Sequence, residues 1–367
     1  YRRQRQMCIR DKSMIMNHES LIATKARRVR TVAPKDALME FGLRRAQGHS
    51  AGLWGARAAM VGGFNGTSNV EAGKRFGIPV LGTMAHSWVM SFDEEIDAFR
   101  EYVRQYHNNL ILLADTYNVL EMGVPHAIQV FKELKEEGRL PGKYGIRIDS
   151  GDIAYLSQEA TRMFTEAGFP DAIISGSNDL DEYTIQSLKA QGCTVTSWGV
   201  GTKIITADGT SALGGVFKMA VKEADGKEVP VMKFSNDVEK MTNPGIKTVY
   251  RFYKKDTGKM ITDLVCLHDE KAADGGDFTL VTESAKWRRK ELKAGTYTVE
   301  ELLRPVVENG RNLPLPALFE IIRYADKQMD TLWPEYTRLL NPDLMEINLS
   351  DKLQTLKSEL IRRELGE

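Results

Sequence analysis

Short apolar runs alternate with amphipathic segments between about residues 51 and 205, and this alternation constrains the fold more than any other feature. Strands separated by amphipathic helices form βα units, whose strands pair in parallel. Because several units follow one another, and polar residues come directly after the strands, the sequence favours a (βα) barrel over an open sheet. The strand-like runs are 78–81, 110–113, 145–148, 172–174 and 194–198.

Apolar spacing and end signals define the helices between these strands. One helix has its apolar residues at helical spacing and ends at Gly138, and the next ends at Gly168, since glycine suits a helix C-terminus. Asn178 or Asp179 is the predicted N-cap of a third helix, which ends at Gly192. The apolar stripe of the first helix is Ala127, Val130, Phe131 and Leu134.

A different pattern begins near residue 216. The dipeptide Asp225-Gly226 and the tripeptide 256–258 each separate two apolar segments, which predicts two antiparallel hairpins. A C-terminal helix is predicted from apolar residues that share one face, namely Leu353, Leu356, Leu360 and Ile361.

The first residues differ from the rest of the chain. Residues 1–12 show no apolar periodicity and are similar to a translated sequencing adapter, so we interpret them as a non-native tail. A disordered basic tail is the alternative. Residues 13–50 are interpreted as the remnant of an N-terminal domain and the lead-in to the barrel. We assign the catalytic α/β barrel to residues 51–215, and the hairpins and C-terminal helical region to residues 216–367.

Composition argues against several classes of protein. The 50 basic and 50 acidic residues balance, so no nucleic acid or anionic membrane is expected as a partner. No apolar run approaches the roughly 20 residues that span a bilayer. The three cysteines lack the spacing of metal ligands and fit a reducing compartment, so we expect a cytoplasmic protein.

Two charged residues alternate with apolar ones on the predicted strand 145–148 and just beyond it. Because side chains alternate between the faces of a strand, Arg147 and Asp149 point to the opposite face from the isoleucines beside them. They form either an internal ion pair or a ligand site. In the second interpretation Arg147 binds a carboxylate or phosphate, and Asp149 and Asp152 hold sugar hydroxyls or Mg²⁺.

Glycine-rich turns follow the later strands. Gly199, Gly201 and Thr202 come after the last predicted strand, and Ser175-Gly176 belongs to a similar run. Barrels often bind phosphate at these positions through backbone N–H groups and a hydroxyl, although glycines also form ordinary turns.

Two further positions are ambiguous from residue type alone. His86 follows a predicted strand end, where a histidine is more often structural than catalytic. Arg44 is half of an arginine pair flanked by glycines and apolar residues, which is unusual for a solvated helix surface.

Several long motifs together resemble the nicotinate phosphoribosyltransferase family. They occur in the family's order, and their number and length make the resemblance specific. They are EFGLRRAQG (40–48), the stretch 62–92 that ends in GTMAHSWVMSF, the turn 115–117, GIRIDSGD (145–152), SGSNDLDE (175–182), GVGT (199–202) and LGGVFKM (213–219).

The resemblance implies a type II phosphoribosyltransferase fold: an incomplete (βα) barrel with a smaller α/β domain contributed by both chain ends. It implies an ATP-coupled ligase of NAD salvage. This enzyme converts nicotinate, 5-phosphoribosyl 1-pyrophosphate, ATP and water into nicotinate mononucleotide, pyrophosphate, ADP and phosphate. It further implies Mg²⁺ as cofactor and a homodimer.

The resemblance also assigns roles to individual positions. His86 matches the histidine that ATP phosphorylates transiently, and Arg44 matches an active-site arginine suited to pyrophosphate. Thr83 and Arg147 match contacts to nicotinate. Asp149 is assigned to catalysis at the ribose or magnesium, and Asp152 to Mg²⁺. The phosphoribosyl pyrophosphate positions are Thr202, Gly201, Gly199, Ser175 and Gly176.

One position bears on the choice of substrate. The sister enzyme for nicotinamide has an aspartate where Ser68 stands here, and an aspartate would repel the carboxylate of nicotinate. Ser68 therefore favours nicotinate. Nicotinamide or quinolinate as substrate, and a non-catalytic barrel fragment, are the alternatives.

One family feature has no match. The resemblance includes an early Asp-x-Tyr pattern that stacks on the nicotinate ring, and this chain lacks it. We therefore expect sequence before Glu19 to be missing, which leaves the activity of the chain alone as an open question.

Overall fold

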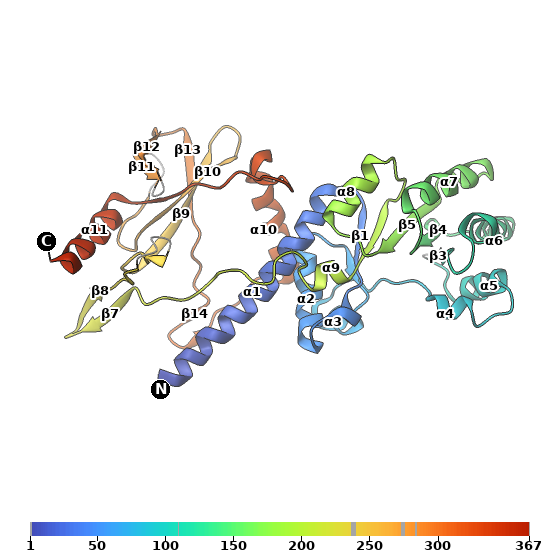
Figure 1. The fold of residues 1–367 in the computed structure, drawn as a ribbon, viewed down its shortest axis with the longest axis horizontal. Coiled ribbons are helices and arrows are strands. Elements are labelled where there is room, and N and C mark those ends of the chain that lie inside the picture. The colour runs from blue at the N-terminus through green and yellow to red at the C-terminus, as the bar shows by residue number, and fades with distance from the viewer. Residues whose placement is uncertain (1, 109, 236–239, 273–275, 283–284, 367) are drawn as a thin grey trace. The chain divides into compact units, whose positions relative to one another are not determined.

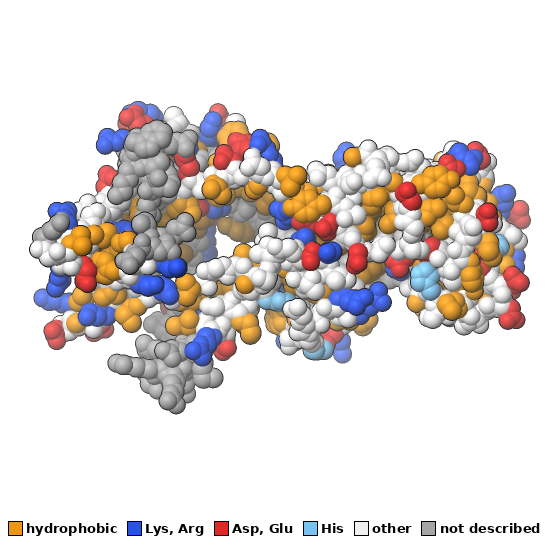
Figure 2. Space-filling model, viewed as in Figure 1, with side chains coloured by type: hydrophobic (Ala, Val, Ile, Leu, Met, Phe, Trp, Pro, Cys, Tyr) orange, Lys and Arg blue, Asp and Glu red, His pale blue; other side chains and the backbone are white. Residues whose placement is uncertain are grey.

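The chain divides into two units, Tyr1–Gly214 and Gly215–Glu367, and the boundary along the sequence falls where the residue pattern changes. The computed structural model describes residues 2–108, 110–235, 240–272, 276–282 and 285–366 (Figure 1). Acidic and basic side chains are interspersed over the visible face of each unit (Figure 2), in keeping with the zero formal net charge. None of the helices in the described part of the chain is long and apolar enough to cross a membrane.

A parallel sheet of six strands forms the centre of the first unit. The order β2-β1-β6-β5-β4-β3 leaves β2 and β3 at open edges, so the barrel is incomplete. Every neighbouring pair is parallel, as the βα alternation predicts. The strands are β1 (Ala37–Glu40), β2 (Gly66–Thr67), β3 (Leu110–Leu113), β4 (Tyr144–Ile148), β5 (Ile173–Asn178) and β6 (Ser197–Val200).

Amphipathic helices cover this sheet; α5, α6 and α7 lie along its β3–β5 half in Figure 1. The predicted stripe of α6 is fully formed, because all four of its apolar residues are buried. Phe131 on α6 also contacts the rings of Tyr144, Phe164 and Phe169. The helices are α1 (Arg2–Val32), α2 (His49–Val61), α3 (Val70–Phe76), α4 (His86–Val89), α5 (Glu95–Gln105), α6 (Val124–Glu136), α7 (Ile153–Glu166), α8 (Glu182–Ala190) and α9 (Thr202–Ile205), with the 3-10 turn η1 (Leu43–Arg45) and the π-helical turn η2 (Val119–Gly123).

Two local predictions were wrong. The run 78–81 is not a strand but a single bridge between Thr67 and Val80, and Val80 is largely exposed. Pro79 has no N–H to donate to a ladder, which limits pairing there. The cap of α8 is Asp181, whose side chain accepts from Thr184 N at 2.7 Å, because Asn178 still belongs to β5.

The segment before residue 51 is part of the first unit. Helix α1 begins at Arg2 and therefore includes most of the stretch 1–12, of which residues 8–12 are exposed. Farther along, α1 packs on α2 and α8, and its buried Lys25 forms an ion pair with Glu182 at 2.9 Å. Strand β1 lies inside the parallel sheet.

The second unit contains a mixed sheet of order β12-β11-β16-β10-β9-β13. Among the strand pairs of this sheet that the structure describes, only β10 and β16 are parallel. The resemblance placed strands from both chain ends in the smaller domain, whereas all six strands described here come from residues 247–349. They are β9 (Lys247–Lys254), β10 (Met260–Leu267), β11 (Phe278–Thr282), β12 (Ala285–Leu292), β13 (Tyr297–Glu301) and β16 (Ile347–Leu349).

Both predicted hairpins are present. Asp225 and Gly226 join β7 (Val221–Ala224) to β8 (Lys227–Pro230) with positive φ angles of 52° and 71°, the conformation of a type I′ turn. The turn 256–258 joins β9 to β10. The predicted C-terminal helix is α11 (Asp351–Leu365), and Leu353 is buried against β10. The remaining elements are β14 (Val307–Glu308), β15 (Arg311–Asn312), α10 (Leu318–Thr331) and the 3-10 turn η4 (Pro334–Tyr336).

Gly145 is expected to be essential for the parallel sheet. A Cβ atom there would lie 1.9 Å from the carbonyl oxygen of Ile173 on the neighbouring strand. We expect Gly145→Ala to lower the free energy of unfolding by about 3 kcal/mol, because β4 and β5 must separate. Thermal unfolding followed by circular dichroism measures this, with Gly142→Ala as control because open space surrounds that position. Equal midpoints for the two variants would contradict the expectation.

Candidate functional site

The carboxyl ends of the parallel strands gather the candidate residues at one edge of the first sheet. Arg147 is next to last on β4, and Ser177 lies near the end of β5, beside Gly199 of β6. Arg147 and Asp149 alternate with the buried isoleucines and line a cavity, as strand geometry predicts. In parallel α/β sheets this edge is where ligands bind.

Arg147 is held by three different segments. Its Nε donates to Ser177 Oγ at 2.8 Å, its Nη1 to Thr83 Oγ1 at 2.9 Å and its Nη2 to Asp149 Oδ1 at 2.9 Å. The guanidinium carbon lies 5.7 Å from the centre of the Phe41 ring. The two interpretations of Arg147 are therefore compatible: it forms an internal ion pair, and it still faces a cavity.

Asp149 is kept ionised by its neighbours. Burial raises the pKa of Asp149, but the hydrogen bond from Ser177 and the charge and hydrogen bond of Arg147 outweigh burial, so its pKa lies below the ordinary value. The nearby His86 ring contributes in the same direction. The site therefore presents a fixed carboxylate beside a fixed guanidinium.

His86 opens the short helix α4 and lies among hydroxyl and carboxylate groups. Its Nδ1 is 3.2 Å from Thr116 Oγ1, and its Nε2 is 3.7 Å from Asp149 Oδ2 and 4.0 Å from Asp115 Oδ1. The side chain is 40 % exposed, so the ring is accessible from the cavity that it lines. The structure thus places His86 next to Arg147 and its partners.

Asp115 is a residue to which sequence reasoning gave no role. Its Oδ2 accepts from Asp149 N at 2.9 Å and from Ser150 Oγ at 2.6 Å. Its Oδ1 is buried and has no hydrogen-bond partner among the described residues. The available signal was its position two residues after the strand 110–113, where the sheet edge receives polar groups. An unpaired buried carboxylate oxygen is costly unless a ligand or ion completes it.

Two cavities adjoin at this edge. The first has a volume of about 290 Å³ and is lined by Ser68, Thr83 and His86 together with the residues that both share. The second has a volume of about 190 Å³ and is lined by Gly199, Gly201, Thr202, Ser177 and Asn178, among others. The shared residues are Phe41, Arg44, Arg147 and Asp149. The two cavities therefore form one continuous site, and the fixed guanidinium of Arg147 lines both of them.

Three predicted residues lie outside these cavities. Ser175 is buried and donates to Ser197 Oγ at 3.4 Å. Gly176 faces the opposite side of β5, toward Val195 and Trp198. Asp152 is the N-cap of α7, where its Oδ1 accepts from Tyr155 N at 3.0 Å.

The next two residues of the strand line the site where Ser175 and Gly176 were expected. Ser177 and Asn178 line the second cavity, because the strand predicted to end at residue 174 continues to Asn178. Asn178 has a φ of 126°, which is strained for a residue other than glycine, and such strain tends to occur at functional sites. In the described part of the chain, no three His, Cys, Asp or Glu side chains are arranged so that together they could hold a metal ion.

Comparison with known proteins gives one consistent family. Residues 37–271 match the nicotinate phosphoribosyltransferase (NAPRTase) family, and residues 246–357 match the nicotinate phosphoribosyltransferase C-terminal domain. The chain is 41% identical to a nicotinate phosphoribosyltransferase of Bacillus subtilis (strain 168) over 351 residues, which cover 95% of this chain and 70% of the relative. The human relative of the same name is 31% identical over 401 residues, 94% of this chain and 73% of its own length.

Solved structures agree with this family in fold. The crystal structure of human nicotinic acid phosphoribosyltransferase has a TM-score of 0.78 and 30% identity, covering 94% of this chain and 74% of the human chain. This likeness confirms the predicted fold class. A nicotinate-nucleotide pyrophosphorylase from Pyrococcus furiosus, with a TM-score of 0.64 and 22% identity over 86% of this chain and 71% of its own, shows likeness of fold alone.

Ser177 is expected to control the ionisation of Asp149. Ser177→Ala removes a hydrogen bond to the carboxylate, so the pKa of Asp149 should rise toward its ordinary value. A carboxylate with a lowered folded-state pKa stabilises the fold above its unfolded pKa, and this stabilisation disappears as pH falls through the folded pKa. In the variant this stabilisation should be smaller, and its loss on acidification should be complete at a higher pH than in the unmodified protein.

Carbon-13 NMR titration of the aspartate carboxyl groups measures this pKa directly. Ser175→Ala is the matched control, because that hydroxyl lies on the same strand face without contacting Asp149. A titration of Asp149 that is identical in both variants would count against the assignment.

Proposed function

The chain belongs to the nicotinate phosphoribosyltransferase family, and on that premise we propose that it joins nicotinate to 5-phosphoribosyl 1-pyrophosphate. The ring nitrogen of nicotinate forms a bond to ribose C1 as the bond from C1 to pyrophosphate breaks. The products are nicotinate mononucleotide and pyrophosphate, the first step of NAD salvage from nicotinate. We propose that hydrolysis of ATP to ADP and phosphate is coupled to this transfer, as in an ATP-coupled ligase.

The orientation of Arg147 is the observation on which the substrate assignment rests. Three hydrogen bonds fix its guanidinium at the wall of the 290 Å³ cavity. A planar guanidinium binds a carboxylate through paired charge-assisted hydrogen bonds, which suits nicotinate. Phe41 lines the same cavity and offers an apolar surface to a pyridine ring.

The second cavity suits the phosphoribosyl group. Gly199 and Gly201 bring backbone without side chains to its wall, and Thr202 adds a hydroxyl. Arg44 and Arg45 line it as well, and their charge favours the pyrophosphate that departs. Because Arg147 and Asp149 line both cavities, the ring nitrogen and the ribose would meet between them.

His86 is the proposed phosphoryl acceptor. An imidazole nitrogen attacks the γ-phosphorus of ATP as the bond to ADP breaks, and water later releases phosphate from the phosphohistidine. The contacts to Thr116, Asp149 and Asp115 limit how the ring can turn. Its position at the nicotinate cavity supports a coupling in which phosphorylation alters the shape and charge of the substrate site.

Carboxylates near His86 suit the magnesium that phosphate substrates require. Mg²⁺ prefers oxygen ligands and neutralises phosphate charge when bound. Asp115 offers the unpartnered Oδ1, and Asp149 offers an ionised carboxylate at the same edge. We therefore propose Asp115 and Asp149 as its protein ligands in place of Asp152, whose carboxylate caps α7.

Observations at the site also bear on the alternatives. Ser68 lines the cavity with Arg147 and, unlike an aspartate at that position, adds no negative charge beside a substrate carboxylate, which favours nicotinate over nicotinamide. The assembly of His86, Arg147 and Asp149 within one unit favours an enzyme over a non-catalytic fragment. We further propose, from family resemblance, a cytoplasmic homodimer.

Product analysis tests the activity itself. The protein with nicotinate, 5-phosphoribosyl 1-pyrophosphate, Mg²⁺ and ATP should form nicotinate mononucleotide, detected by liquid chromatography. Nicotinamide and quinolinate in parallel reactions should give little product. If nicotinamide or quinolinate were converted faster than nicotinate, that compound would be assigned as the substrate instead. If none of the three gave product, the proposed activity would be rejected.

His86→Ala should remove the coupling to ATP. We expect loss of radioactive phosphate transfer from γ-labelled ATP to the protein and at least a tenfold smaller stimulation of product formation by ATP, since the acceptor nitrogen is gone. His107→Ala is the control, because His107 is exposed and lies outside both cavities. Persistent labelling of the His86 variant would show that another residue accepts the phosphoryl group.

Ser68→Asp should weaken nicotinate binding. A carboxylate at this wall would repel the substrate carboxylate and compete for Arg147, raising KM for nicotinate by roughly 10- to 100-fold. Ser68→Asn is the matched control, since it is similar in size to aspartate but uncharged. Steady-state kinetics measure both, and equal KM values for the two variants would argue against a nicotinate carboxylate at Arg147.

A further inference from the structure

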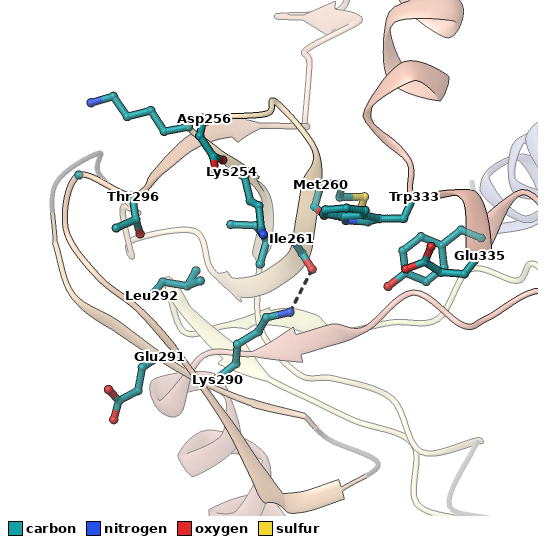
Figure 3. A pocket seen from close by; sticks show the side chains of 13 residues that line it. Lys254, Asp256, Met260, Ile261, Lys290, Glu291, Leu292, Thr296, Trp333 and Glu335 are labelled. Carbon is teal, nitrogen blue, oxygen red and sulfur yellow. Dashed lines mark hydrogen bonds between the residues drawn. The ribbon is translucent and has the colours of Figure 1, made fainter.

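The second unit contains a cavity that the proposed reaction does not use. It has a volume of about 780 Å³ and lies between the β9–β10 turn, the end of β12 and η4 (Figure 3). This volume is in the range of small-molecule sites. All of its lining residues belong to the second unit, so the cavity is complete within that unit.

The floor of this cavity is apolar and fixed. Met260, Ile261, Leu292 and Trp333 contribute to it. The Nε1 of Trp333 donates to the carbonyl oxygen of Met260 at 2.7 Å, which anchors the indole. Lys259, outside the cavity, donates to Leu332 O at 2.9 Å and holds the backbone just before Trp333. The indole ring of Trp333 is therefore already fixed, and a ligand can pack on it without the entropy loss of ordering a mobile side chain.

Two lysines place positive charge beside this floor. The Nζ of Lys254 lies 5.3 Å from the centre of the Trp333 ring, and the Nζ of Lys290 donates to Ile261 O at 3.4 Å. Figure 3 shows both side chains directed toward the space beside Ile261. Lys290 also forms an ion pair with Glu346 at 3.8 Å, whereas Lys254 has no ion pair with any described residue.

Acidic residues limit how much negative charge the cavity accepts. Glu291 points away from it in Figure 3, as expected for the neighbour of Lys290 on a strand. Asp256 stands at the β9–β10 turn and Glu335 beyond Trp333. A compact anion between the lysines is favoured, whereas an extended polyanion would approach these carboxylates.

We propose that this cavity binds a small molecule that combines a planar heteroaromatic ring with a single phosphate, the chemical class of nucleoside monophosphates. The ring packs on Trp333 and Met260, and the phosphate lies between Lys254 and Lys290. Ammonium groups on flexible stems suit a phosphate monoester, and the indole suits stacking. The site is separate from the catalytic residues and stands independently of the proposed reaction.

Hydrogen–deuterium exchange of the full chain with AMP as the probe tests the location. Bound AMP should slow amide exchange in residues 254–261, 290–296 and 333–336. Adenosine, which lacks the phosphate, and ATP, which carries extra charge, should protect these segments less at equal concentration. Protection only in the first unit, or equal or stronger protection of these segments by ATP, would overturn the proposal.

Charge-removing variants test the recognition. Lys254→Ala and Lys290→Gln should each weaken AMP binding by about tenfold, because each loses one charge-assisted contact. Lys227→Ala is the matched control, an exposed lysine on the separate β7–β8 hairpin. Thermal unfolding of all three variants identifies any loss of fold. Unchanged affinity in folded Lys254 and Lys290 variants would rule out the assigned phosphate position.

Discussion

The hydrogen-bonded fixation of Arg147 is the interaction on which the rest of the site depends. A largely buried guanidinium is tolerated only when its donors are satisfied, and here Asp149, Ser177 and Thr83 supply acceptors from three separate segments. These bonds align the loop before α4 with the ends of β4 and β5. His86 begins α4, so the same network determines how its ring meets the carboxylates.

The glycines at the end of β6 and just after it that suggested phosphate binding are also required for packing, because the segment at Phe41 lies very close to them. A Cβ on Gly199 would lie 2.6 Å from the Phe41 ring, and one on Gly201 would lie 3.0 Å from the Phe41 carbonyl oxygen. These glycines let the segment after β1, with Arg44, approach β6 closely. The absence of side chains at Gly199 and Gly201 also exposes backbone at the second cavity. Close packing and the proposed phosphate contact therefore both require glycine at these two positions.

Local patterns predicted the elements that depend on local information. The α6 stripe, β3 and the Asp225-Gly226 turn follow from apolar spacing and from backbone preference, and each has the expected form. The run 78–81 failed because pairing depends on which strand lies beside it. Asp115 was unassigned because it lies 29 residues from His86 along the chain, and only the fold brings the two side chains together.

The sequence by itself determined the parallel α/β architecture, the family and the residue types at the strand ends, because periodicity and ordered motifs record them directly. Only the tertiary structure decided which of these residues share a cavity. It separated Ser177 from Ser175, joined Asp115 to His86 and gave Asp152 to a helix cap. Strand pairing sets the first two arrangements and arises from contacts between segments that are distant along the chain, whereas the cap at Asp152 is a local hydrogen bond from Tyr155 N, three residues farther on.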